Sequence, residues 1–296
     1  TKYTGAGCYY RCNDQNLDSH LNIYSDNLTV ESSLLIADSQ VTDSTSNDNY
    51  WIHAYSYVDI EIDDFAISDS SLISRTYHNY VQWGTEYRTA NTDFDIEASE
   101  LDVDNSTLMS KIEIGTNNCS SCILTDFNLQ AVRAHFDNVD FYLNNGDFLF
   151  ESLWMSNSTI EEGDTEYQTR YETISLNVKD IDTGNSSMGD VYLHNSTIEF
   201  DTNTWNYDEA YKFTFDIDTI GDIQIIDSEI NTTHFRTSTI ELEGADIQVV
   251  NSTLWSGTKY TGAGCYYRCN DQNLDSHLNI YSDNLTVESS LLIADS

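Results

Sequence analysis

The chain has 296 residues, of which 50 are acidic and 12 are basic, so its formal net charge is −38. This charge repels the phosphate backbone and offers no basic patch, which excludes nucleic-acid binding, and an anionic lipid surface would repel it too. No run of apolar residues is long enough to span a membrane, whereas 39% hydrophobic and 12% aromatic residues can build a large core.

The two ends of the chain carry the same sequence, since residues 1–39 recur, position for position, at 258–296. Identity that includes Ser, Asp and Asn of the surface type indicates a recent duplication rather than a functional motif. We therefore expect residues 1–257 to be one full repeat unit and residues 258–296 to begin the next, with no linker between them. A start at Thr1, with no apolar signal segment in front, fits an excerpt from a longer tandem array.

A shorter pattern recurs inside the unit: apolar, any, apolar, any, small polar residue, Ser, any, apolar. The alternation predicts a half-buried strand, the polar residue a left-handed corner, and the last apolar residue a return to the inward face. The first and last apolar positions are seven residues apart at Leu28/Leu35, Phe65/Leu72, Leu101/Leu108, Cys122/Leu129, Leu153/Ile160, Val191/Ile198, Ile223/Ile230 and Ile247/Leu254. The corresponding corners are Ser32, Asp69, Asn105, Asp126, Asn157, Asn195, Asp227 and Asn251.

This pattern resembles the right-handed parallel β-helix of the pectate-lyase-like superfamily, from about Leu21 to Leu254 and again from Leu278. The resemblance implies an all-β fold, a β-solenoid with about eight coils per 257-residue repeat that continues into the next repeat. Each coil would have three short strands, with a single left-handed residue between the second and the third. Eight coils at roughly 4.8 Å each would make a unit on the order of 38 Å long.

Nine Asn-x-Ser/Thr sequons are candidate N-glycosylation sites: Asn27, Asn105, Asn118, Asn157, Asn185, Asn195, Asn231, Asn251 and Asn284. Four of these asparagines fall in the corner column. They could instead form a ladder inside the coil, where a buried Asn could not carry a glycan. The Asp residues of the same column favour a hydrated corner, because stacked carboxylates in a dry interior are costly. We therefore expect covalent N-glycans on a secreted chain.

Cysteines form two close pairs in the unit, and the duplicated end repeats one of them, at Cys8 and Cys12, Cys119 and Cys122, and Cys265 and Cys269. The two pairs of the unit belong to coils about three rungs, roughly 14 Å, apart, so a single four-cysteine zinc site is not expected. Local disulfides in loops of a secreted protein are the prediction, with no metal. The alternative for Cys122 is a small buried hydrophobic residue on an apolar column.

Acidic clusters at 59–64 and 93–104 could pair carboxylates for glycoside hydrolysis or bind calcium loosely. Strand alternation points many of these side chains outward, where charge is expected anyway. Arg133, Arg170 and Lys179 form no group around a carboxylate pair in the sequence. We therefore expect no catalytic residue, no enzyme activity and no cofactor.

Aromatic residues are concentrated in the segments of variable length that contain Trp51, Trp83 and Trp205. The interpretation we favour is a structural subunit of an extracellular or cell-surface filament, acidic and N-glycosylated, whose partners are copies of itself joined end to end. The first alternative is an adhesin or carbohydrate-binding stalk that uses these aromatic segments. The second is a polysaccharide lyase or glycoside hydrolase.

Overall fold

The computed structural model describes eleven segments of the chain, all built from strands and short bends. They are residues 2–5, 15–43, 52–80, 88–114, 124–143, 146–162, 172–178, 189–202, 212–234, 237–258 and 274–296. Their strands are β1 (Lys2–Gly5), β2 (Gln15–Glu31), β3 (Leu34–Asp43), β4 (Ile52–Ser68), β5 (Ser71–Tyr80), β6 (Arg88–Ile114), β7 (Leu124–Leu143), β8 (Gly146–Ser156), β9 (Thr159–Glu162), β10 (Glu172–Val178), β11 (Val191–His194), β12 (Thr197–Thr202), β13 (Lys212–Asp218), β14 (Ile223–Ile226), β15 (Glu229–His234), β16 (Thr237–Val250), β17 (Thr253–Thr258), β18 (Asp275–Glu288) and β19 (Leu291–Asp295). Within these ranges no helix has the length and apolar character of a membrane span.

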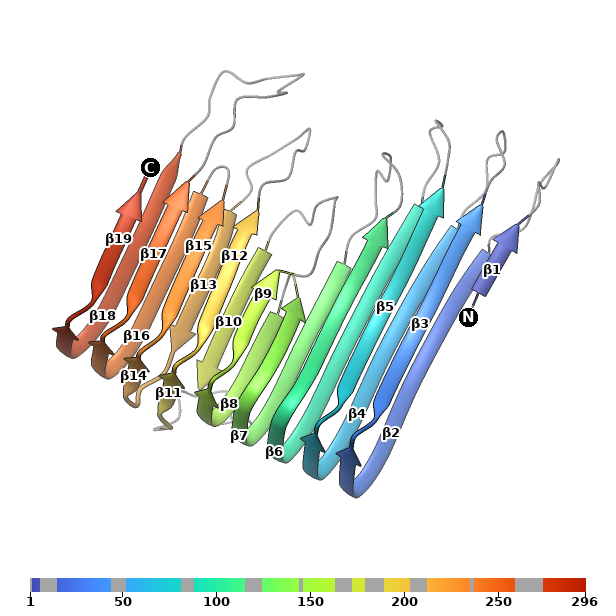
Figure 1. Cartoon of the computed structure of the whole chain (residues 1–296), viewed down its shortest axis with the longest axis horizontal. Coiled ribbons are helices and arrows are strands. Elements are labelled where there is room, and N and C mark those ends of the chain that lie inside the picture. The colour runs from blue at the N-terminus through green and yellow to red at the C-terminus, as the bar shows by residue number, and fades with distance from the viewer. Residues whose placement is uncertain are drawn as a thin grey trace.

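Every strand pairing is parallel, and each strand bonds to the equivalent strand of the preceding and following coil. The strands therefore lie side by side in chain order along the long axis, with the two termini at opposite ends (Figure 1). This architecture is a parallel β-solenoid, which confirms the predicted fold class. The handedness, the number of coils per unit and the extent of the repeat unit stay predictions.

Each coil has three pairing segments, and the left-handed corner separates the second from the third. In β4 the first segment ends at Ile62, the second begins at Asp64, and the corner follows at Asp69. The first segment, which precedes the repeated pattern, contains Val58 and Ile60 in β4, and these residues pair in register with Phe94 and Ile96 of the next coil. Side chains of alternate residues in all three segments point inward.

The inward columns follow the predicted grid in every coil except the fourth. The first apolar position of the middle segment is occupied in turn by Leu28, Phe65, Leu101, Ala134, Leu153, Val191, Ile223, Ile247 and Leu285. The last apolar position is occupied by Leu35, Leu72, Leu108, Phe141, Ile160, Ile198, Ile230, Leu254 and Leu292. Most of these side chains are fully buried.

The prediction for the fourth coil was wrong. Leu129, expected to close that coil, pairs with Ile96 in the first segment, and the coil instead runs from Ala134 to Phe141. Its corner is Asn138 and not Asp126. The third and fourth coils are offset by 33 residues and the fourth and fifth by 19, so the next coil follows with almost no insertion. Cys122 itself lies outside the described residues.

The corner column adopts the left-handed conformation that the sequence predicted. Its nine members have φ between 45° and 55° and are Ser32, Asp69, Asn105, Asn138, Asn157, Asn195, Asp227, Asn251 and Ser289. Asn and Asp tolerate this region better than other side chains because their short polar groups can bond locally. All nine are exposed, so the corner is hydrated and the inward ladder is excluded for these residues.

The N–H of the Ser that follows the corner has no main-chain acceptor. It donates instead to the hydroxyl of the equivalent Ser in the next coil. The corner N–H of Asn195 donates to the Ile226 carbonyl of the next coil, whereas the N–H of Thr197 donates back to the Ser158 carbonyl of the previous one. The N–H of Ser196, which lies between them, donates instead to the Ser228 hydroxyl at 3.1 Å.

The same bond recurs along the solenoid at 3.0–3.4 Å, and each acceptor hydroxyl donates to the carbonyl two residues earlier. These serines are buried, except the half-buried Ser290, so the hydroxyl satisfies an N–H that solvent does not reach. Ser106 is the exception in this series, because the equivalent residue of the next coil, Val139, has no hydroxyl to accept a hydrogen bond from the Ser106 N–H.

Phenylalanines fill the core around the shortest coil. Phe94 and Phe127 stack at 4.4 Å between ring centroids, and Phe127 also contacts Phe148 at 5.8 Å. Gly146 occupies the next place in the column of Phe94 and Phe127, where a Cβ atom would lie 3.1 Å from the Phe127 carbonyl oxygen and nearer still to Leu143. The missing side chain makes room for the neighbouring rings.

Residues 275–295, whose sequence is that of 18–38, stack on the coil before them as any other coil does. Ile247 pairs with Leu285, and Leu254 pairs with Leu292, in continuous parallel register. The pairing of the duplicated sequence with the coil before it is therefore parallel and in register, as is the pairing of Leu28 with Phe65.

We expect Ser228→Ala to lower the free energy of unfolding by about 1–3 kcal/mol, because it leaves the buried Ser196 N–H without an acceptor. Urea unfolding, followed by circular dichroism, measures the effect. Ser99→Ala, at an exposed bend, is the control and should stay within about 0.5 kcal/mol of the parent. Equal midpoints for the two variants would contradict the role assigned to the hydroxyl.

Candidate binding groove

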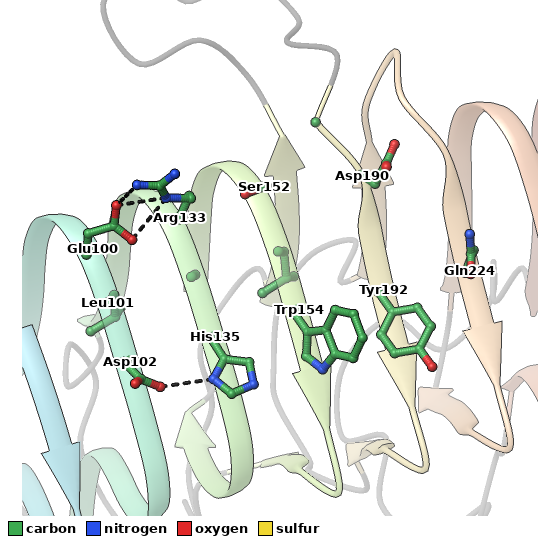
Figure 2. Close-up of a pocket in the computed structure, with 13 residues that line it drawn as sticks. Glu100, Leu101, Asp102, Arg133, His135, Ser152, Trp154, Asp190, Tyr192 and Gln224 are labelled. Atoms are coloured by element: carbon green, nitrogen blue, oxygen red, sulfur yellow. Dashed lines mark hydrogen bonds and ion pairs between the residues drawn. The ribbon is translucent and has the colours of Figure 1, made fainter.

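A shallow groove runs along the outer face of the middle segments, across the third to seventh coils. Its floor is a row of stacked, in-register side chains (Figure 2), which are Asp102, His135, Trp154, Tyr192 and Gln224. A second row, two residues earlier in each strand, lines one side and includes Glu100, Arg133, Ser152 and Asp190. Parallel pairing places successive members of each row about 4.8 Å apart.

The centre of the floor is aromatic. Trp154 and Tyr192 lie side by side with their ring centroids 4.2 Å apart and their planes at 39°. His135 flanks Trp154 at 6.4 Å. The Trp154 side chain is 50% exposed, although it sits between the buried residues Leu153 and Met155. The two rings therefore stack on each other and form an aromatic platform that is partly open to solvent.

An Arg–Glu ion pair and a His–Asp contact lie at one end of the groove. The Arg133 guanidinium donates to both carboxylate oxygens of Glu100, with the Nε contacts at 2.8 and 3.0 Å, and this carboxylate raises the pKa of Arg133. Nδ1 of His135 lies 2.9 Å from a carboxylate oxygen of Asp102. Parallel stacking brings Glu100 beside Arg133 from 33 residues away, so this Arg pairs with one carboxylate and not with a carboxylate pair among the described residues.

The aromatic platform also carries polar groups that are free to bind a ligand. Within the described part of the chain, the Trp154 indole N–H, the Tyr192 hydroxyl and the Gln224 amide have no hydrogen-bond partner. Asp190, which lines the same groove, accepts at Oδ1 from the main-chain N–H of Asp222 at 3.0 Å. The site thus combines flat apolar ring faces with donors and acceptors, a combination suited to a polar ligand that has an apolar face.

The described sequons lie on the surface to different degrees. Asn27, Asn105, Asn157, Asn195, Asn251 and Asn284 are exposed, whereas Asn231 is half-buried. Asn118 and Asn185 lie outside the described residues. Exposure makes the six accessible, and glycosylation itself stays a prediction.

Side-chain amides link the corners into an external ladder. The Asn138 Nδ2 donates to Asn105 at 2.6 Å, Asn195 donates to Asn157 at 2.8 Å, and Asn251 donates to Asp227 at 2.6 Å. Asn157 departs from this series and donates to the Asp137 carboxylate at 2.6 Å. Ser156 donates to the same oxygen at 2.7 Å. These two bonds hold the pKa of Asp137 below its usual value.

The acidic clusters point outward, as the alternation predicted, and parallel register stacks like charges. Asp59 lies beside Asp95, and Glu61 lies beside Glu97. Neutral donors relieve this repulsion, since Asn128 donates to Asp95 at 2.6 Å. Burial and the carboxylates of Asp59 and Asp95 raise the pKa of Tyr57 to about 12. Among the described residues, no group of three or more His, Cys, Asp or Glu could hold a metal ion.

Several predicted features fall outside the described residues. They are the candidate disulfide cysteines Cys8, Cys12, Cys119, Cys122, Cys265 and Cys269, the residues Trp51, Trp83 and Trp205 of the aromatic segments, and the basic residues Arg170 and Lys179.

Sequence reasoning missed the groove, because it followed the inward columns alone. Trp154 and Tyr192 each stand between the first two apolar residues of their coil, so both positions could have been aligned from the same grid. The outward column would then have shown two aromatic residues on successive coils.

Comparison of the chain with protein-family models, with curated proteins and with solved structures gave no match.

We expect Asp137→Asn to destabilise the protein at neutral pH by up to about 1 kcal/mol, because the carboxylate accepts two hydrogen bonds at a partly exposed site. A depressed pKa in the folded state stabilises the fold above the unfolded pKa of about 3.9, and this contribution is lost as the pH falls through the folded pKa. Urea midpoints measured from about pH 2 to 7 should therefore converge at the acid end.

The control for this variant is Asp63→Asn, at an exposed carboxylate with no hydrogen-bond partner in the described part of the chain. It should not reproduce the pH dependence. A difference between Asp137→Asn and the parent that persists unchanged to the lowest pH would refute the role of the two bonds.

Proposed function

We propose that the protein is a structural subunit of an extracellular filament in which β-solenoid units continue end to end. The observation that carries this proposal is the parallel register between β16 and β18, which spans the start of the duplicated sequence. A coil with the sequence of residues 18–38 can both stack on the last coil of one unit and receive the second coil of the next.

Exposure of identical side chains supports the same conclusion. Val30 is 8% exposed where β4 stacks on β2, whereas its copy Val287, at the end of the described structure, is 44% exposed. Leu285, the copy of the half-buried Leu28, is 48% exposed. The difference is apolar surface that another coil of this kind would cover, and covering it is favourable at about 25 cal/mol per Å².

Acidity suits a filament of this kind. The outer faces carry rows of carboxylates, and the net charge of −38 opposes lateral aggregation of the open strand edges. End-to-end stacking overcomes this repulsion locally, because main-chain hydrogen bonds and apolar columns continue across each step.

Electron microscopy of the assembled protein tests the proposal directly. We expect continuous rods of constant width with an axial repeat of about 38 Å, set by coils spaced at about 4.8 Å. Discrete particles with closed ends would overturn it.

A charge at the open end tests the stacking surface. We expect Val287→Asp to weaken self-association on the order of tenfold or more, because the carboxylate would be buried without a partner. Thr286→Asp, which adds the same charge on the exposed outer face, is the matched control and should associate as the parent does. Sedimentation velocity over a range of concentrations measures both, and equal weakening by the two variants would contradict end-to-end contact.

Glycans on the corner column are the second part of this proposal. Asn157 and Asn195 occupy adjacent coils and bond to each other, so two glycans would start about 4.8 Å apart and overlap. Asn105 and Asn251 are each separated from them by a corner that has no sequon.

We therefore expect glycopeptide mass spectrometry of the secreted protein to find Asn105 and Asn251 occupied, with no more than one glycan shared between Asn157 and Asn195. Summed occupancy of that pair well above one glycan per chain would contradict the crowding. Unmodified asparagine at all four positions would remove glycosylation from the proposal.

A further inference from the structure

We propose that the groove built on Trp154 and Tyr192 binds a neutral oligosaccharide that lies along the solenoid axis. The site is on a side face of the coil stack, so this inference does not depend on end-to-end assembly.

The aromatic platform supplies the first part of the argument. The Trp154 and Tyr192 rings are 4.2 Å apart, and Figure 2 shows both on the open face of their strands. The equivalent positions in other described coils hold Thr29, Ala66, Gln248 and Thr286, so the aromatic surface is confined to this stretch. An exposed aromatic face stacks favourably on the C–H face of a pyranose ring, which leaves the sugar hydroxyls at the edges.

Polar groups beside the platform supply the second part. The Trp154 indole N–H and the Tyr192 hydroxyl are at its edges, and the Gln224 amide follows on the next coil. Ser152 and Asp190 line the neighbouring row. Hydroxyl groups of a sugar both donate and accept, so they match this mixture better than an apolar peptide surface would.

Charge decides between classes of saccharide. Glu100 already binds the Arg133 guanidinium, so this cation is not left to bind an acidic sugar, and Nδ1 of His135 already lies against Asp102. The surrounding charge of −38 repels a polyanion. A neutral chain of hexoses or N-acetylhexosamines meets neither obstacle.

The spacing of the rows favours an oligosaccharide over a monosaccharide. His135, Trp154, Tyr192 and Gln224 occupy four consecutive coils, which extends the floor over about 14 Å in the axial direction. Successive sugar units could therefore meet successive rungs.

The experiment is a binding screen of the intact, non-glycosylated chain against oligosaccharides of neutral hexoses and N-acetylhexosamines. Uronic acid oligomers, glucosamine oligomers and an aromatic-rich peptide are the comparators. Isothermal titration then gives the affinity of each hit. We expect a neutral oligosaccharide to bind, with an affinity little changed between about 0.1 and about 1 M salt, where the Debye length falls from about 10 to about 3 Å.

Variants connect the binding to the groove. Trp154→Ala should weaken it on the order of tenfold, and Tyr192→Ala similarly, whereas Tyr192→Phe keeps the ring and should lose less. Trp255→Ala is the matched control, since Trp255 is also exposed, at 38%, but lies in β17 outside the groove. Circular dichroism checks that each variant is folded.

Three results would overturn the proposal. The first is that no neutral oligosaccharide binds, and the second is that Trp154→Ala binds as well as the parent or loses no more than Trp255→Ala does. The third is that a charged oligomer or the peptide binds more tightly than every neutral oligosaccharide.

Discussion

The structure depends on one constraint, which is that each coil must hydrogen-bond to its neighbours in parallel and in register. Main-chain bonds at about 4.8 Å per step leave no freedom for a coil to slide, so equivalent side chains stack into continuous columns. An apolar column such as that of Leu153, Val191 and Ile223 is buried as a consequence, and a residue that breaks the column would expose two neighbours. Length differences between coils lie in the chain between pairing segments, both after the closing strand and, between β10 and β11, after the first segment, because an insertion inside a segment would shift every column after it.

The corner is where this constraint is hardest to satisfy. The N–H of the left-handed residue donates to the following coil, and the N–H two residues later donates to the preceding coil. The N–H between these two has no main-chain acceptor. The Ser196 N–H illustrates this, and the Ser228 hydroxyl resolves it. Asn or Asp at the corner therefore tolerates the left-handed backbone conformation, and the Ser immediately after it supplies the hydroxyl that accepts from the unpaired N–H of the preceding coil.

Register has a cost on the outer surface, because it stacks like charges as strictly as it stacks leucines. Asp59 against Asp95 and Glu61 against Glu97 are examples, and amide donors such as Asn128 offset part of the repulsion. The groove is the exception on this acidic surface. There the same stacking brings together two aromatic rings, the Arg133–Glu100 ion pair and the contact between His135 and Asp102.

The sequence by itself determined the period, the inward columns of seven of the eight predicted coils and the left-handed corners of those coils. It did so because buried apolar positions and corner residues obey local rules that recur in each copy. It misplaced the fourth coil, because Asp126 and Leu129 fit the corner and closing positions of the pattern although Phe127 does not fit the Ser position. The true coil opens at the small residue Ala134 and has Val139 in place of the Ser after its corner. Only the tertiary structure decided which outward side chains meet. Arg133 meets Glu100 through an offset of 33 residues that the misplaced fourth coil concealed, whereas the grid already aligned Trp154 with Tyr192 and only the structure shows how closely their rings stack.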